Sequence, residues 1–531
     1  MYRPVIMGKN GLVTSAHPLA SSAGLDVLKE GGNAFDAAIA VNAVLGVVHP
    51  HQCGIGGDIF CLAYSKEHDK ILFLNGSGRS PLNAGIDTFT ARGYKNLPER
   101  GVLPVTVPGC VHAWGELWRR FGSRPFARLL DPAVTYAREG FPLSYHVAGF
   151  LQKNQELFWQ DPHLRRIFMP HDFPAKAREL IRQEDLARTL ETIGREGAES
   201  FYQGEIARKI HNYIARKNGL LTQRDLELHT SNWGEPAAVP YGDFMIYQTP
   251  PNTQGLSSLV AFNILEGLDL FSMGCDTAEI VHYLVETKKI AYQYREQYIT
   301  DPEFVPIEYT DFLDKQYACR LRKMIEPTQA APVSGPADCN GDTTFFAAAD
   351  REGNVISVVQ SLYSPFGSGC LVDDTGIILQ NRGSRFSLDP AHINRLEPHK
   401  RTFHTLTACL VTREGRPVLA FGTSGGDGQP QTHLQVISKI LHFGYNIQDA
   451  IEAPRWLHGC ISPDEKEMHL YLEGRFSLEV AATLESWGHS VRMVEDWAEV
   501  VGHAQGVMLD PDTGIYSGGA DPRSDGYAMA W

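Results

Sequence analysis

A strand that begins at a pair of threonines places the strongest constraint on this chain. Gly341-Asp342-Thr343-Thr344 precedes Phe345–Asp350, whose apolar run predicts a buried strand. Gly-Asp before a strand is an ordinary turn signal. If the Asp342–Thr343 bond were cut, however, Thr343 would carry a free amine beside its hydroxyl and would supply both nucleophile and base. The local sequence leaves both interpretations open, a turn and a nucleophile.

The order of predicted elements indicates helices that cover stacked antiparallel sheets. Two hairpins are predicted late in the chain, Phe345–Ala349 with Val355–Ser361 and Thr405–Thr412 with Pro417–Phe421. Further strands are predicted at Ile59–Tyr64, Ile71–Leu74, Gly506–Leu509 and Tyr527–Trp531. Helices are predicted at Pro18–Lys29, Ala34–Val48 (capped by Asn33), Val111–Phe121, Pro125–Arg138, Gln183–Arg195, Ile206–Lys217, Thr277–Tyr298 and Gln431–Phe443, and the whole region Pro104–Glu326 is predicted to be mainly helical. Because hairpins imply antiparallel pairing and no linker interrupts the pattern, we expect one large α+β unit.

Composition argues against several kinds of partner. The 531 residues carry a net charge of −14 and no long basic run, so nucleic acid is not expected to bind. The nine cysteines include no C-x-x-C pair, which favours reduced thiols and a cytoplasmic location. The first ten residues lack the apolar core of a signal peptide, and Ala34–Val48 is too short to span a bilayer, so no membrane association is expected.

Two further features of the sequence carry possible chemistry. Ser361 ends the strand that returns beside Thr343, so its hydroxyl could bond either the Thr343 hydroxyl or nearby backbone. The loop Gly422–Gly428 lies between a strand and a helix, where backbone N–H groups could hold a phosphate or an oxyanion. It lacks the G-K-[ST] of a P-loop and the spacing of a dinucleotide site. A plain glycine turn remains the alternative for this loop.

No metal or other cofactor is predicted. His49, His51 and Cys53 are metal-ligand types, but Pro50 and Gly54 mark a tight loop, and no fourth ligand is evident.

Taken together, these pieces resemble the γ-glutamyltransferase family of N-terminal-nucleophile hydrolases. The resemblance follows nearly the whole chain in one order. It lies in the segments Gly11–Leu28, Gly31–Ala38, Gly54–Gly57, Phe201–Ala207, Gly219–Thr222, Asp301–Pro302, Asp342–Thr344, Phe366–Gly369, Ser424–Gly426 and Asp521–Gly526.

The resemblance implies a proenzyme that cuts itself between Asp342 and Thr343. A large chain, Met1–Asp342, and a small chain, Thr343–Trp531, would then stay together as one intertwined four-layer αββα sandwich. Thr343 matches the family nucleophile, and Ser361 stands where a supporting threonine is usual. Gly425 and Gly426 match the backbone donors of the oxyanion hole. The sequence does not settle whether such two-chain units form a homo-oligomer.

Several positions depart from the family's pattern for γ-glutamyl groups. Tyr363 replaces an asparagine, Arg382 and Arg385 replace a glutamine and an aspartate, and His404 and Thr405 replace a pair of serines. The usual carboxylate-binding arginine aligns near Ser77, and Arg79 is two places away. Arg385 would repel the substrate ammonium group that the aspartate would attract.

These departures favour an acyl donor that ends in a carboxylate and lacks an α-amine, because arginine forks bind carboxylates at two points. The pattern is similar to the oxamate amidohydrolase and cephalosporin (glutaryl) acylase branch of the family. We therefore expect hydrolysis of a small anionic amide. Three alternatives stay open: γ-glutamyl amides or glutathione as donors, a non-catalytic protein that binds small anions, and arginines that only pair with Asp373, Asp374 and Asp389.

Overall fold

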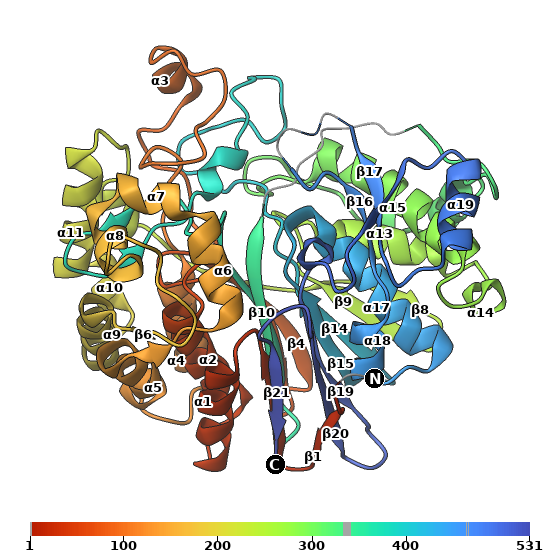
Figure 1. The fold of residues 1–531 in the computed structure, drawn as a ribbon, viewed down its shortest axis with the longest axis horizontal. Helices are drawn as coiled ribbons and strands as arrows, with labels where there is room; N and C mark the ends of the chain where they lie inside the picture. Colours follow the sequence, from red (N-terminus) through yellow and green to blue (C-terminus); the bar gives the residue numbers. More distant parts are fainter. Residues whose placement is uncertain (1–2, 333–340, 463–464, 466) are drawn as a thin grey trace.

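The computed structural model describes residues 3–332, 341–462, 465 and 467–531, which form a four-layer sandwich (Figure 1). Two seven-stranded sheets face each other in the middle, and helices cover the outer side of each. Every strand pair within these two sheets is antiparallel. The predicted αββα architecture is confirmed.

Strands from both sides of the Asp342–Thr343 bond are interleaved in each sheet. The first sheet has the order β21 (Tyr527–Ala530), β2 (Gly11–Ser15), β10 (Asp342–Asp350), β11 (Val355–Tyr363), β3 (Asp58–Ser65), β4 (Lys70–Gly76) and β7 (Asn232–Gly234). The second has the order β1 (Ile6–Gly8), β20 (Tyr516–Ala520), β19 (Ala504–Leu509), β15 (Arg416–Thr423), β14 (Cys409–Arg413), β9 (Phe244–Gln248) and β8 (Ala237–Tyr241). A cut at this bond would therefore leave two chains that share both sheets.

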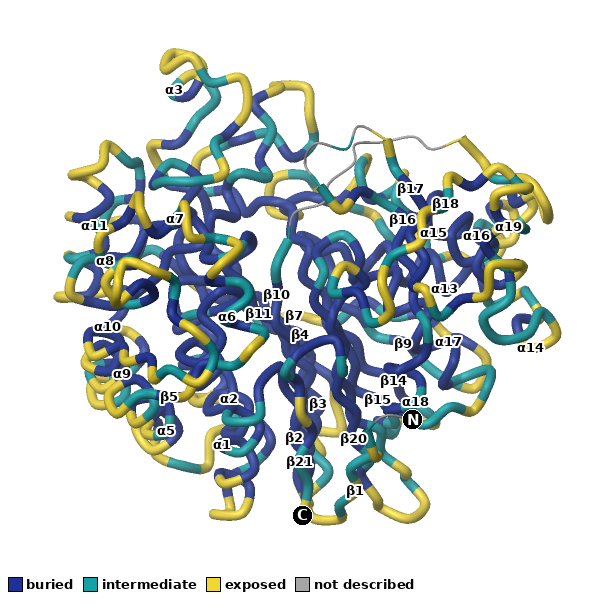
Figure 2. Tube along the Cα trace, viewed as in Figure 1, coloured by how far each residue is buried: buried dark blue, intermediate teal, exposed yellow. Residues whose placement is uncertain are grey.

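The first sheet is covered by α1 (Pro18–Lys29), α2 (Ala34–Val48) and α4 (Cys110–Phe121), with α5 (Phe126–Glu139) and α9 (Glu184–Glu196) outside them. The second sheet is covered by α13 (Gly255–Leu265), α17 (Gln429–Phe443) and α18 (Ile447–Glu452), with α15 (Ala278–Tyr298) packed outside α13 and α17. Every residue of α2 is buried, as its apolar faces predicted, because it lies between the sheet and α5 (Figure 2). Asn33 caps this helix as expected and shares a capping box with Asp36.

The interior of the sandwich fixes β10 firmly. Phe345, Ala347 and Ala349 pack between the two sheets, while Phe346 and Ala348 pack against the helices on the other face. Both faces of the strand are dry, which explains its continuous apolar sequence. The residues at its start are therefore held by a rigid element.

The region from Pro104 to Glu326 is mainly helical, as predicted, but it also contains the short strands β7, β8 and β9, which were not predicted. Pro240 lies in β8, and a proline removes one backbone donor from a strand. It is tolerated because β8 is the last strand of its sheet. The strand predicted from Thr405 begins only at Cys409. The predicted helices named above are present, and their ends differ from the prediction by at most two residues.

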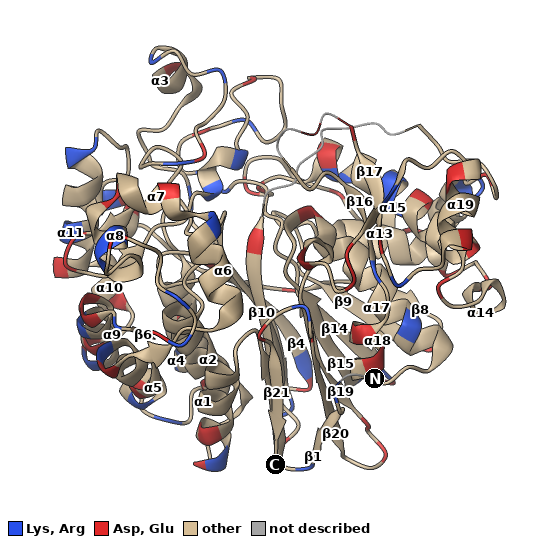
Figure 3. Ribbon diagram, viewed as in Figure 1, with Lys and Arg blue, Asp and Glu red and all other residues tan. Residues whose placement is uncertain are grey.

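Charged side chains of both signs alternate along the outer helices, and the sheets carry few of them (Figure 3). The eight described cysteines are free thiols, and the ninth, Cys339, lies outside the described residues. Met1, where the predicted large chain begins, also lies outside them. Among the helices that the structure describes, none is both long enough and apolar enough to cross a bilayer.

Candidate active site

Thr343 is the second residue of β10 and is fully buried. Its hydroxyl Oγ1 accepts a hydrogen bond from Nε2 of Gln429, the first residue of α17, at 3.2 Å. The register shifts here, since Asp342 pairs with Tyr363 while Thr344 pairs with Gln360. The partner strand β11 thus bulges opposite Thr343, and bulges commonly redirect side chains next to active sites.

The Ser361 hydroxyl lies in this bulge and bonds to backbone, which is the second of the two predicted arrangements. It donates to the carbonyl oxygen of Asp342 and accepts from the N–H of Tyr363 at 2.6 Å. The carbonyl that it contacts belongs to the Asp342–Thr343 bond. Ser361 is therefore placed to stabilise charge on that oxygen if the bond is attacked.

The glycine loop between β15 and α17 lies against the same bond. Gly425 and Gly426 have φ angles of 107° and 50°, in the left-handed region that favours glycine. A Cβ atom placed on Gly341 would lie 2.7 Å from Cα of Gly426, so loop and junction touch. Within the described part of the chain, no hydrogen bond uses the N–H of Gly425 or Gly426. Both groups are thus available as donors at the junction.

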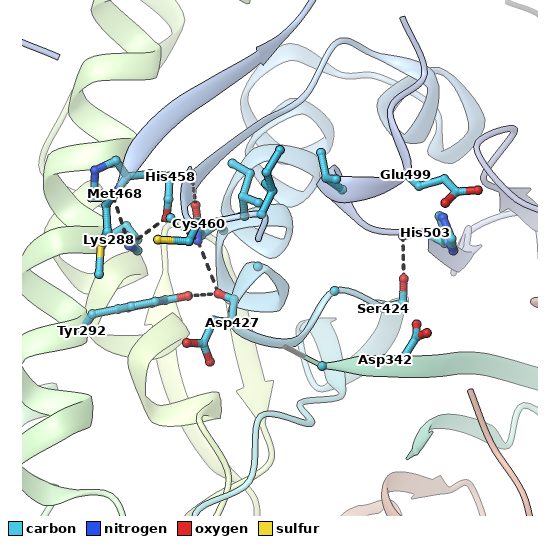
Figure 4. A pocket seen from close by; sticks show the side chains of 18 of the residues that line it. Lys288, Tyr292, Asp342, Ser424, Asp427, His458, Cys460, Met468, Glu499 and His503 are labelled. Carbon is cyan, nitrogen blue, oxygen red and sulfur yellow. Dashed lines mark hydrogen bonds between the residues drawn. The ribbon is translucent and has the colours of Figure 1, made fainter. Parts of the chain in front are cut away.

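A cavity of about 280 Å³ opens beside the junction (Figure 4). Gly341, Asp342, Ser424 and Gly425 line one side of it, and Lys288 and Tyr292 of α15 line another. Burial raises the pKa of the Asp342 carboxyl to about 7, and Gln52 donates to its Oδ1 at 2.5 Å. Substrate could therefore approach the threonine from this side.

Four of the predicted binding residues lie together. The Arg382 guanidinium stacks 4.1 Å from the centre of the Tyr363 ring and donates to Thr405 Oγ1 at 3.3 Å. Its neighbour His404 bonds through Nε2 to Asp58 Oδ2 at 3.2 Å. Burial lowers the pKa of Arg382 to about 10, and no described carboxylate lies within ion-pair distance of it. A buried, unpaired guanidinium is a natural site for a ligand carboxylate.

The other two predicted arginines differ in their surroundings. Arg385 lies 5.1 Å from the Phe403 ring, and burial lowers the pKa of its guanidinium. Asp427 lies nearby. Burial alone would raise the pKa of its carboxyl, but the charges of Arg295 and then Arg385 outweigh burial and lower this pKa. Arg79, in contrast, is held by both carboxylate oxygens of Glu303 at 2.8 Å. We therefore leave Arg79 out of the binding site.

The surface ion pairs considered for these arginines are not seen for Arg79 or Arg382. Asp373 is paired instead with Arg216 and with His163, and Asp374 accepts from Lys209 through its backbone carbonyl. Asp389 caps the backbone N–H of Ala391.

Two of the three possible metal ligands in the loop from His49 to Cys53 already have hydrogen-bond partners, whereas neither ring nitrogen of His51 has one among the described residues. His49 bonds Gln52 at 2.8 Å, and the thiol of Cys53 donates to the His49 carbonyl. Elsewhere, among the described residues, His282, Glu286 and His489 offer ligand atoms within 4.8 Å of one another. There Lys289 already neutralises Glu286 at 2.7 Å, and the two imidazoles share a hydrogen bond. We assign no metal to either group.

Several residues of the site were not predicted. Asp427 lies within the glycine loop, Gln429 follows the loop directly, and Asp58 follows the Gly54–Gly57 segment, so the sequence around the predicted site pointed to them. Lys288 and Arg295 lie on a helix more than a hundred residues upstream of the loop, and nothing in the sequence links them to it.

Comparison with known proteins agrees with this geometry. A family model described as gamma-glutamyltranspeptidase matches residues 20–531. The "glutathione hydrolase-like YwrD proenzyme" of Bacillus subtilis (strain 168) is 40% identical over 99% of both chains. The "oxamate amidohydrolase proenzyme" of Klebsiella pneumoniae is 34% identical over 98% of both. A crystal structure of cephalosporin acylase from Bacillus halodurans has a TM-score of 0.93 and 38% identity, with 100% of this chain and 97% of that one covered. The chain thus belongs to the gamma-glutamyltranspeptidase family and is an N-terminal-nucleophile hydrolase of amide bonds.

Proposed function

We propose that the chain cuts its own Asp342–Thr343 bond and then uses Thr343 to hydrolyse a small amide whose acyl group ends in a carboxylate. The observation that carries this proposal is the convergence at one peptide bond of the Thr343 hydroxyl, the Ser361 donor and the Gly425–Gly426 loop. Relatives of nearly the same length are named proenzymes, which supports self-processing.

In self-cleavage, the Thr343 hydroxyl attacks the Asp342 carbonyl carbon and takes over the acyl group as an ester. The C–N bond breaks, and its nitrogen gains a proton and becomes the free amine of Thr343. Water then hydrolyses the ester and releases the Asp342 carboxylate. During the attack, Ser361 stabilises the carbonyl oxygen as it gains charge.

In turnover, the amine of Thr343 accepts the proton of its own hydroxyl, which attacks the substrate carbonyl. The Gly425 and Gly426 N–H groups stabilise the oxyanion, which is worth ~2.7–4 kcal/mol per donor in comparable enzymes. The substrate C–N bond breaks, and the leaving amine takes the proton. Water hydrolyses the acyl-enzyme and restores Thr343, or an amine accepts the acyl group instead.

The acyl preference rests on Arg382, the buried cation without a carboxylate partner, with Arg385 contributing to the same positive field. Oxamate-like and glutaryl-like amides carry the anion that this field favours. A γ-glutamyl donor is the second candidate, because the Asp58 carboxyl lies in the same cluster and could meet an α-ammonium. The free cysteines support a reducing, cytoplasmic setting.

Mass spectrometry of the purified protein tests the processing step. We expect two fragments, the smaller beginning at Thr343, whereas Thr343→Ala should remain one full-length chain. Thr344→Ala is the matched control, because the buried Thr344 hydroxyl has no hydrogen-bond partner in the described structure. A fragment that begins at another residue, or cleavage of Thr343→Ala, would refute the proposal.

A comparison of donors tests the acyl preference. Oxamate, a glutaryl amide and a γ-glutamyl amide are offered to the processed enzyme and to the double variant Arg382→Gln/Arg385→Asp. We expect the wild type to favour the first two and the variant to lose that preference. Arg79→Gln is the control and should keep the wild-type ranking, since Arg79 is bound to Glu303. A wild-type preference for the γ-glutamyl amide would contradict the argument.

A further inference from the structure

The cavity beside the junction has a positively charged end that the mechanism above does not use. Lys288 and Arg295 both line it, from one face of α15. Arg295 is neutralised by Asp427 at 3.0 Å and by Glu296 at 2.6 Å. Lys288 is 4% exposed, and within the described residues no carboxylate lies within ion-pair distance of it. A buried ammonium without a counter-ion at a cavity wall indicates a functional site.

The contacts of Lys288 hold its ammonium group at the cavity (Figure 4). Nζ donates to the carbonyl oxygen of His458 at 3.0 Å and lies 3.1 Å from Nδ1 of the same residue. It also lies 4.3 Å from the centre of the Tyr292 ring. Burial, and after it the charge of Lys288, holds the pKa of the His458 imidazole well below its usual value. His458 is therefore neutral, and its Nδ1 accepts a hydrogen bond from Lys288 Nζ. These bonds use two of the three ammonium donors, and the third is available to a ligand.

The rest of the cavity is suited to a small organic group. Leu457, Ile461 and Met468 contribute apolar surface to the same cavity as Lys288. The volume of about 280 Å³ is at the lower end of the range of roughly 300–1,000 Å³ for small-molecule sites. None of the acyl-binding candidates Tyr363, Arg382 and His404 lines this cavity, whereas Asp342 and Gly425 do. If the acyl group binds at Arg382, the cavity is left for the amine half of the substrate.

We propose that Lys288 determines leaving-group specificity by binding a carboxylate on the amine half of the substrate, as in an amide of an amino acid or an aminobenzoate. This inference rests on the proposed function. Burial lowers the pKa of Lys288 to about 7, so its charge, and with it the preference, is present below pH 7 and is lost as the pH rises through 7. The groups that face Lys288 are Arg295, Lys289, Asp427, Glu296, His458 and Tyr292.

Two donors that differ only in this carboxylate test the proposal, glutaryl 4-nitroanilide and glutaryl 3-carboxy-4-nitroanilide. With the processed Lys288→Met enzyme, we expect KM for the carboxylated donor to rise about tenfold, with kcat within twofold and the neutral donor unaffected. Lys288→Arg should retain the preference. Lys209→Met is the control, because Lys209 lies on the surface beside Glu205 and should behave as the wild type. The proposal would be overturned if the ratio of the two KM values were the same in Lys288→Met as in the wild type, including the case in which KM rises equally for both donors.

Two further measurements keep the test independent of folding and of turnover. In the wild type alone, KM for the carboxylated donor should rise relative to the neutral donor between pH 6 and pH 8, and a flat ratio contradicts the role of Lys288. Calorimetry with the leaving amines, 5-amino-2-nitrobenzoate and 4-nitroaniline, should show tighter binding of the first, and this difference should vanish in Lys288→Met. If neither anilide is hydrolysed, the proposed acyl preference fails, while the binding data still decide on Lys288.

Discussion

Replacement of Ser361 by alanine should slow self-cleavage without abolishing it. The Ser361 hydroxyl donates to the Asp342 carbonyl oxygen, which gains negative charge when Thr343 attacks. In the resting precursor this neutral hydrogen bond contributes about 0.5–1.5 kcal/mol. A donor to a developing oxyanion contributes about 2.7–4 kcal/mol. The barrier should therefore rise by the difference, roughly 2–3 kcal/mol, which slows the reaction about 30- to 150-fold.

A time course of freshly purified precursor on a denaturing gel measures this rate. Ser361→Thr should process nearly as fast as the wild type, because it keeps a hydroxyl at the same place. Ser357→Ala is the matched control on the same strand, since the Ser357 hydroxyl is buried without a partner in the described structure. If Ser361→Ala cleaves at the wild-type rate while it melts at a similar temperature, the hydroxyl plays no part and the argument is refuted.

Three further predictions concern residues around the site. Gln429→Ala should lower kcat of the processed enzyme about fivefold, or ~1 kcal/mol, with KM unchanged, because Gln429 donates to the hydroxyl of Thr343, the proposed nucleophile. A rise in KM alone would instead assign Gln429 to substrate binding. Burial raises the pKa of the Asp58 carboxyl from 3.8 to about 7, so the folded protein binds a proton that the unfolded chain releases, and stability falls as the pH rises from about 4 to 7. Over this range the melting temperature of Asp58→Asn should fall less than that of the wild type. If the melting temperatures of the two proteins fell equally with pH, Asp58 would be excluded as the cause. Asp521→Ala should lower the free energy of unfolding in urea by roughly 3–5 kcal/mol, since it leaves the buried Arg455 without an ion-pair partner among the described residues, whereas Arg523 keeps Glu473; a loss below about 1 kcal/mol would contradict this.

The sequence was sufficient to predict the centre of the fold because its signals there are local. The apolar run after Thr344 and the turn at Asp350–Asn354 predict the β10–β11 hairpin, and the pairing brings Ser361 next to the junction. Which group the Ser361 hydroxyl bonds to depends on the bulge in β11, and no local sequence pattern predicted that bulge. The β8–β9 hairpin was missed because its two strands are short, and because the edge strand β8 contains a proline, which weakens the sequence signal of a strand.

The availability of each arginine could not be predicted, because it depends on partners that are distant in the sequence. Arg79 and Arg382 are equally basic in the sequence and both are buried in the fold. Glu303, more than two hundred residues from Arg79, neutralises that arginine, while the Arg382 guanidinium meets a ring and a hydroxyl and, among the described residues, no carboxylate. Arg295 and Lys288, on the same helix, differ in the same way, since Asp427 forms an ion pair with Arg295 and not with Lys288. A buried cation is free to bind an anionic substrate where the fold supplies no carboxylate of its own, so the specificity proposed above depends as much on where Glu303 and Asp427 lie as on the basic residues themselves.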